Sequence, residues 1–167
     1  HGGTLDPEAT GILLVALGQA TRFFPYLSVH DKAYDGTIRL GYATDTYDAS
    51  GEPASPEAEA LPEEPAVAAA MRRLEGGMLQ VPPPFSAKKI GGKPAYKLAR
   101  AGKEVALPPS RVNVCGFRIK NYAPPLLEFE VACSAGTYVR SLAHDLGRLL
   151  GCGAHLSRLR RTASGPF

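Results

Sequence analysis

The sequence lacks a long apolar run, has few cysteines and carries only a slight excess of positive charge. Its longest apolar run, Ile12–Leu17, is far shorter than the roughly 20 residues that a membrane-spanning helix needs, and no charged-then-apolar signal segment opens the chain. Cys115, Cys133 and Cys152 are odd in number and have no CxxC spacing, which argues against a disulfide framework or a structural zinc site. These absences predict a soluble, cytoplasmic protein without metal or cofactor.

The composition is that of one globular domain, which we expect to span residues 1–167. Apolar residues make up 44% and charged residues 21% of the chain. A net charge of +3 is a weak signal by itself, but acidic residues gather in 52–75 and basic residues in 88–103 and 158–161. This segregation indicates one positive face suited to a phosphate-rich partner. Ordinary solvated surface charge is the alternative that the charges alone leave open.

Hydrophobic periodicity and turn residues predict strands and helices in mixed order. Strands are expected over residues 12–17, 33–42, 112–120, 126–134 and 155–162. Helices are expected over residues 19–27, 66–74, 95–101 and 137–150. A surface loop is expected over 48–65, and Pro82–Pro84 forbids regular structure. Because this order contains no βαβ repeat, it favours an α+β fold on a largely antiparallel sheet.

The first candidate for chemistry is Asp6, which lies in the pentapeptide Gly3-Thr4-Leu5-Asp6-Pro7. The pentapeptide alone favours a structural role, since an aspartate before proline commonly caps a helix or turn. A longer pattern surrounds it, which reads His1-x-Gly3-Thr4-Leu5-Asp6-Pro7-x-Ala9-Thr10-Gly11-x-Leu13.

Further motifs follow in order along nearly the whole chain. They are Leu17-Gly18-Gln19-Ala20-Thr21-Arg22-Phe23, Asp31-Lys32-x-Tyr34, Leu40-Gly41-x-x-Thr44-Asp45-Thr46-x-Asp48-x-x-Gly51, Pro82-x-x-x-Ser86-Ala87-x-Lys89, Tyr96-x-x-Ala99-Arg100-x-Gly102, Gly136-Thr137-Tyr138-Val139-Arg140 and Gly151-Cys152-Gly153-Ala154-His155-x-x-x-Leu159-Arg160-Arg161. Together with the pattern around Asp6, this series resembles the TruB family of tRNA pseudouridine synthases. The resemblance implies the pseudouridine synthase fold and isomerisation of uridine 55 in the T loop of tRNA.

The resemblance assigns three catalytic positions: the aspartate is Asp6, the tyrosine that packs on the target base is Tyr34, and the arginine that pairs with the aspartate is Arg140. The reaction breaks a C–N glycosidic bond, turns the uracil and rejoins it through carbon, which a carboxylate can assist as a nucleophile or by stabilising a cationic sugar. An arginine keeps that carboxylate ionised. Tyr34 offers a flat face and a phenol for the final proton removal. We expect Arg140 within about 4 Å of Asp6.

The resemblance also implies substrate contacts, for each of which an ordinary core or surface position is the alternative. His1 would fill the space left by a flipped nucleotide, and Tyr138 and Leu159 would line the pocket. The candidates for phosphate contacts are Lys89, Arg160 and Arg161. The expected partner is the T stem-loop of tRNA, without a membrane or a small-molecule cofactor. Nothing in the sequence demands more than a monomer.

Two departures from the family pattern, Gly2 and Lys88, do not touch the proposed chemistry. The family also has an N-terminal strand with a Lys-Pro motif before the position of His1, and a PUA-type RNA-binding domain after that of Phe167, so we expect this chain to be a catalytic core. The alternatives are a guide-RNA-dependent pseudouridine synthase, a non-catalytic RNA-binding module and a glycoside hydrolase. The hydrolase would need a second acid near Asp6, for which Glu8 is the nearest choice.

Overall fold

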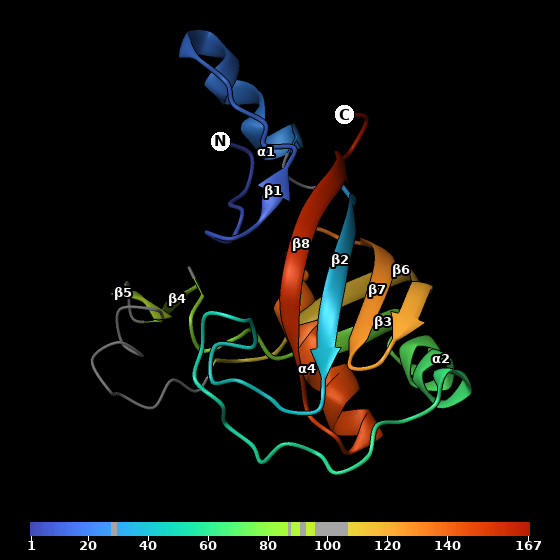
Figure 1. The fold of residues 1–167 in the computed structure, drawn as a ribbon. Coiled ribbons are helices and arrows are strands. Elements are labelled where there is room, and N and C mark those ends of the chain that lie inside the picture. The colour runs from blue at the N-terminus through green and yellow to red at the C-terminus, as the bar shows by residue number, and fades with distance from the viewer. Residues whose placement is uncertain (28–29, 87, 91–92, 96–106) are drawn as a thin grey trace.

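The computed structural model describes residues 1–27, 30–86, 88–90, 93–95 and 107–167, and a six-stranded sheet forms its centre (Figure 1). In spatial order, the strands are β1 (Thr10–Gly11), β8 (Ala154–Ser164), β2 (Lys32–Leu40), β7 (Leu126–Cys133), β6 (Ser110–Ala123) and β3 (Gly76–Gln80). Neighbouring strands are antiparallel except β1, which runs parallel to β8. The expected α+β class with a largely antiparallel sheet is confirmed.

Two helices pack on this sheet and enclose the core. Helix α4 (Val139–Leu150) contacts β8, α2 (Glu64–Arg73) contacts β6, and the helices also contact each other. The sequence forms α4 because its buried apolar side chains recur three and four residues apart. The helix ends at Gly151, where a φ of 75° permits the left-handed cap and the N–H donates to the Arg148 carbonyl. Core side chains from both layers include Ile38, Leu40, Val67, Met71, Leu127, Phe129, Val131, Leu142 and Leu146.

Most of the expected elements are present within a few residues of their predicted ends. The strands expected over 33–42, 112–120, 126–134 and 155–162, the helices over 66–74 and 137–150 and the irregular proline stretch are confirmed. In the expected loop over 48–65, no helix or strand occurs before α2 begins at Glu64. Strand β7 shows why, since its buried and exposed side chains alternate, as on a sheet with one face against the core. Apart from Ala95, the helix expected over 95–101 lies outside the described residues.

The expectation of a buried strand over 12–17 is wrong. Only Thr10 and Gly11 pair with β8. Every second side chain after them is exposed to solvent, namely those of Leu13, Val15 and Leu17, and Leu17 reaches 83% exposure. The reason lies in Gly11, whose φ of 104° turns the chain out of the strand direction. Ile12 makes one last hydrogen bond, from its N–H to the Arg161 carbonyl at 3.0 Å, and the chain then leaves the sheet edge.

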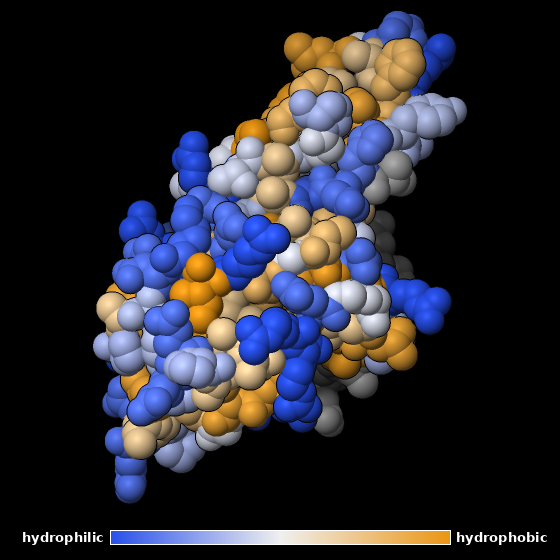
Figure 2. All heavy atoms as spheres, turned by 90° about the vertical axis from the view of Figure 1, so that its right-hand side faces the viewer, coloured by the Kyte–Doolittle hydropathy of each residue, from blue (hydrophilic) through white to orange (hydrophobic). Residues whose placement is uncertain are grey.

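The segment over 19–27 is helical as expected, although most of it is 3₁₀ rather than α. It consists of η1 (Gly18–Phe23) and the single turn α1 (Phe24–Leu27). This arm projects from the sheet and carries exposed apolar side chains, seen at one end of Figure 2. Two very short strands, β4 (Lys89–Ile90) and β5 (Lys93–Pro94), form a separate hairpin.

Candidate active site

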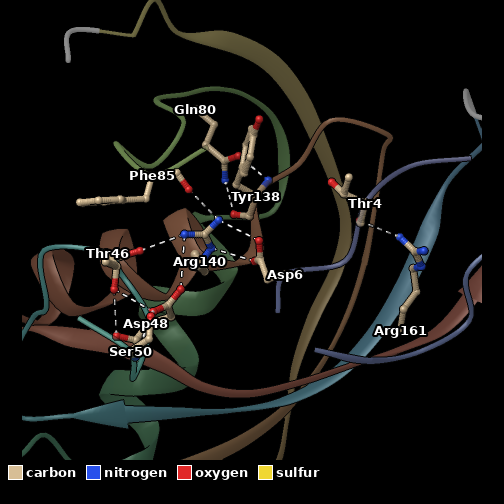
Figure 3. Close-up of polar contacts among 10 residues, drawn as sticks. All are labelled: Thr4, Asp6, Thr46, Asp48, Ser50, Gln80, Phe85, Tyr138, Arg140 and Arg161. Atoms are coloured by element: carbon tan, nitrogen blue, oxygen red, sulfur yellow. Dashed lines mark hydrogen bonds and ion pairs between the residues drawn. The ribbon is translucent and has the colours of Figure 1, made fainter. Parts of the chain in front are cut away.

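Asp6 and Arg140 form a two-pronged ion pair (Figure 3). Asp6 lies in the loop before β1, and Arg140 is the second residue of α4, 134 positions further along the chain. Arg140 Nε donates to Asp6 Oδ2 and Nη2 donates to Oδ1, each at 2.8 Å. Parallel charge-assisted bonds of this kind are among the stronger and more directional polar contacts in proteins. The expected pairing within 4 Å is confirmed.

The arginine is buried and the aspartate is open. The Arg140 side chain is 7% exposed, whereas that of Asp6 is 37% exposed. A buried guanidinium needs partners for all of its N–H groups, and three chain segments supply them. Nη1 donates to the Thr46 carbonyl at 3.2 Å and lies 3.4 Å from Asp48 Oδ2, and Nη2 donates to the Phe85 carbonyl at 3.1 Å. Arg140 therefore holds Asp6 from a fixed position.

Asp48 is a site residue that the sequence analysis did not single out. Its Oδ2 faces Arg140, and its Oδ1 accepts hydrogen bonds from Thr46 Oγ1 at 2.7 Å, Ser50 N at 3.1 Å and Ser50 Oγ at 2.5 Å (Figure 3). These donors fix the orientation of the Asp48 carboxylate. The available signal was the string Thr44-Asp45-Thr46-x-Asp48, which carried part of the resemblance without a role for its second aspartate.

The start of α4 is fixed by the end of β3 and the residue that follows it. Tyr138, which precedes the helix, has no side-chain cap, but its backbone pairs with the Gln80 amide in both directions, at 2.8 and 3.1 Å (Figure 3). Ser141 Oγ donates to the Val81 carbonyl at 2.8 Å. The bond to the Tyr138 N–H satisfies a donor that a helix start leaves unpaired, and the three bonds together hold the turn that carries Arg140.

A cleft of about 1000 Å³ opens beside this ion pair. Asp6, Arg140 and Asp48 line it together with Leu159 and Arg160, two of the residues expected at the substrate. The other lining residues come from the Asp6 loop, the 48–50 turn and strands β2, β6, β7 and β8. Three expected pocket residues, His1, Tyr34 and Tyr138, are not among those that line it.

Tyr34 lies deeper, on β2, where it belongs to the core cluster and is 8% exposed. Burial raises the pKa of its phenol, the guanidinium of Arg161 partly opposes that rise, and the nearby Asp6 carboxylate adds to it. The phenol is therefore protonated at neutral pH. Tyr34 does not line the cleft.

Arg161 is 2% exposed, a position that does not fit a phosphate contact. Its Nε donates to the Ile12 carbonyl at 2.6 Å and its Nη1 to the Thr4 carbonyl at 3.4 Å. These carbonyls flank Asp6 in sequence, so Arg161 anchors the loop that carries the aspartate. Arg160, in contrast, is exposed at the cleft. The side chain of Lys89 lies outside those described.

Within the described ranges, no group of three or more His, Cys, Asp or Glu side chains could hold a metal ion. None of the helices in those ranges is both long and apolar enough to cross a bilayer. Glu8, the second acid that a glycoside hydrolase would need, also lines the cleft.

Comparison with known families accounts for the entire chain. The family model described as the TruB family pseudouridylate synthase N-terminal domain matches residues 1–139, and that of the tRNA pseudouridylate synthase B C-terminal domain matches residues 140–167. The protein named tRNA pseudouridine synthase B from Opitutus terrae is 47% identical over 172 residues, covering 100% of this chain and 69% of the relative. The protein of the same name from Dinoroseobacter shibae is 50% identical over 169 residues, covering 100% of this chain but only 55% of the relative's length.

Solved structures show the same fold. A Cbf5-Nop10-Gar1 complex contains a chain with a TM-score of 0.74 and 33% identity, covering 100% of this chain and 40% of that one. A chain of an H/ACA RNP bound to a substrate RNA containing 2'-deoxyuridine matches with a TM-score of 0.68 and 30% identity over 100% of this chain and 38% of that one. The family models cover both the Asp6 loop and the α4 arginine that pairs with it. The chain belongs to the TruB family of pseudouridylate synthases.

Proposed function

We propose that this chain is the catalytic core of a tRNA pseudouridine synthase, which converts uridine 55 of the T loop to pseudouridine. The observation that carries the proposal is the Asp6–Arg140 pair, because it presents a fixed, partly exposed carboxylate at a large cleft. Membership of the TruB family and the names of the relatives from Opitutus terrae and Dinoroseobacter shibae support the same substrate.

Asp6 is the proposed nucleophile or charge stabiliser. In the reaction, the bond from C1′ to N1 of uracil breaks, the base turns, a bond from C1′ to C5 forms, and the proton on C5 is replaced by one on N1. A carboxylate can bond to the electrophilic carbon or stabilise a positive sugar. Each Asp6 oxygen keeps a lone pair free after its bond to Arg140. Substrate must enter as a flipped base, because stacking shields the glycosidic bond.

Tyr34 is the proposed group that packs on the base and helps to remove the C5 proton. Because burial keeps its phenol protonated at neutral pH, proton removal requires that the phenol first pass its own proton on. The Arg161 guanidinium beside it lowers the pKa and so favours that step. His1, Tyr138 and Leu159 are proposed to contact the flipped nucleotide or its surroundings.

The RNA partner is proposed from charge at the cleft. Arg158 and Arg160 are exposed on β8 and both line the cleft, where they can meet phosphates. Lys89 is proposed for the same role from the resemblance alone. Because Asp6 and Arg140 come from one chain, a monomer suffices, and we propose that it acts in the cytoplasm. The proposed chemistry uses the Asp6 carboxylate and the Tyr34 phenol, without metal or cofactor.

The test is incubation of the protein with unmodified tRNA, followed by mapping of pseudouridine through carbodiimide block of reverse transcription. We expect one new stop, at position 55 of the T loop, which is missing with Asp6→Asn and with tRNA whose position 55 is cytidine. No stop in the T loop at high protein concentration would overturn the proposal.

A guide-RNA-dependent synthase is the second candidate, because one of the solved structures described above is an H/ACA RNP, an assembly of protein and RNA, bound to a substrate RNA. The same assay separates the two candidates. Product from purified protein and tRNA alone supports the stand-alone enzyme, whereas a requirement for added guide RNA supports the second candidate.

A further inference from the structure

Tyr47 adopts a backbone conformation that side chains other than glycine rarely take. Its φ is 65°, the one positive value found outside glycine in the described part of the chain. Its ring is stacked on that of His144, with centroids 3.8 Å apart and an angle of 12° between the planes. A left-handed tyrosine costs free energy, so surrounding contacts must hold it there.

Tyr47 lies in the turn over residues 46–49, between the two residues of that turn that contact Arg140. Thr46 supplies a carbonyl and Asp48 a carboxylate, on either side of Tyr47 in sequence. The Tyr47 carbonyl accepts the Leu156 N–H at 3.0 Å, and the Ala49 N–H donates to the Leu156 carbonyl at 2.9 Å. The turn is therefore hydrogen-bonded to β8 through its backbone, while the Tyr47 ring stacks on α4.

His144, on which the Tyr47 ring stacks, lies on the same helix as Arg140. It lies four residues after Arg140 on α4, so the two side chains occupy the same side of the helix one turn apart. Its Nδ1 is buried and has no hydrogen-bond partner among the described residues. The imidazole stacks on Tyr47, and burial, with Arg148 nearby, lowers the pKa of His144 and keeps it neutral.

We propose that Tyr47 is a positioning residue, which uses the His144 stack to hold Thr46 and Asp48 against Arg140 and thereby orients Asp6. This inference rests on the proposed function. Without the ring, the turn would no longer be attached to α4 by the stack, and its two backbone hydrogen bonds to β8 would open more often. Small displacements of a catalytic constellation cost about a hundredfold in rate, so removal of the stack should lower the rate of chemistry and leave RNA affinity unchanged.

The first test compares variants of Tyr47 by single-turnover rate and tRNA affinity. Tyr47→Phe keeps the ring and should stay within about threefold of the parent rate. Tyr47→Asn tolerates the left-handed backbone but removes the ring, and its rate should fall about tenfold or more at unchanged Kd. His144→Ala should act likewise, and the double variant should be little slower than either single variant.

Tyr122 offers a matched control. Its hydroxyl donates to the Pro62 carbonyl at 2.6 Å and so anchors the segment between β2 and α2, which also contains Tyr47, at a different point. Tyr122→Ala should lower the stability of the fold, but its rate should match the parent at temperatures where it is folded. A rate decrease in Tyr122→Ala equal to that of Tyr47→Asn would overturn the inference, because general destabilisation would explain both.

Amide hydrogen exchange provides a second readout that needs no activity. In Tyr47→Asn and His144→Ala, the amides of Ala49 and Leu156 should exchange about tenfold faster, while those of β7 stay at parent rates. Parent-like exchange and parent-like rate in Tyr47→Asn would together sink the inference. A parent protein that makes no pseudouridine would defeat the proposed function, and the exchange rates would still decide whether the stack holds the turn.

Discussion

Tyr34 and Arg161 are direct partners across the antiparallel strands β2 and β8, and both side chains are buried. Arg161 also binds the carbonyls of Thr4 and Ile12, on either side of Asp6. One guanidinium thus lies beside the proposed base-packing tyrosine and anchors the loop of the proposed nucleophile. Asp6 and Tyr34, the two groups proposed to face the substrate, are therefore linked through Arg161, which is not proposed to touch the substrate.

Asp6→Asn should abolish turnover while tRNA binding persists. The amide has nearly the same shape but cannot act as an anionic nucleophile, so we expect the rate to fall by at least about a thousandfold. Tritium release from C5-labelled uridine in tRNA measures it. Glu130→Gln, which removes a charge from an exposed ion pair with Arg118 at 3.8 Å, is the control. Residual Asp6→Asn activity within tenfold of the parent would rule out the assignment.

Tyr34→Phe should keep the ring and remove the phenol. We expect about a hundredfold slower single-turnover chemistry, which is within the range that general acid–base groups contribute, with an unchanged Kd for tRNA. Stopped-flow fluorescence for binding and rapid quench for chemistry separate the two quantities. If the variant reacts at the parent rate, Tyr34 is a packing residue only.

Arg161→Lys should destabilise the protein and slow catalysis together. A lysine retains the charge but cannot make the spread contacts of a guanidinium, so the free energy of unfolding should fall by about 1–3 kcal/mol as the buried bonds are removed. Arg160→Lys is the matched control, because its exposed side chain should change stability by less than about 0.5 kcal/mol. Urea denaturation gives both values, and equal midpoints for the two variants would contradict the anchoring role.

Arg158 and Arg160 should contribute to RNA affinity rather than to chemistry. The double change Arg158→Gln with Arg160→Gln should weaken tRNA binding and flatten its dependence on salt, by about 0.7–0.9 in logarithmic slope for each phosphate that is no longer bound. Filter binding from low to moderate salt measures the slope. An unchanged slope would mean that neither arginine meets a phosphate.

Stability should fall as the pH drops below 6.5. Burial lowers the pKa values of His144 and His155 below that of an unfolded histidine, so the folded state binds fewer protons in this range. The stabilising difference is complete above pH 6.5 and is lost as the pH falls through the lowered values. Thermal denaturation between pH 7.5 and 5.5 tests this, and His144→Phe, which keeps a ring on Tyr47, should show a smaller decline.

The sequence predicted the secondary structure best where packing repeats regularly, as in α4 and β7. It failed over Ile12–Leu17, because an apolar run reveals neither the turn at Gly11 nor the exposure of the side chains that follow it. Spacing could not have paired Asp6 with Arg140, since 134 positions separate them. That prediction depended on the resemblance, which also carried Arg161 over to a surface role that its burial does not support.

Asp48 belonged to a motif of the resemblance but had no role assigned there, and Tyr47 was beyond prediction for a different reason. Both residues matter through the direction of the turn over residues 46–49. That direction depends on the left-handed backbone of Tyr47 and on the stacking of its ring on His144 of α4. A left-handed tyrosine has no local signature, unlike a glycine. Such features follow from tertiary contacts and can be recognised only after the chain is folded.

The position of β8 sets a condition on when the enzyme can work. This strand, late in the chain, is inserted between β1 and β2, which are made well before it. Until β8 emerges from the ribosome, β2 has an unpaired edge and the loop of Asp6 has no Arg161 to bind. A nascent chain would therefore be inactive until this strand has been made, and its exposed β2 edge would be the region most in need of a chaperone.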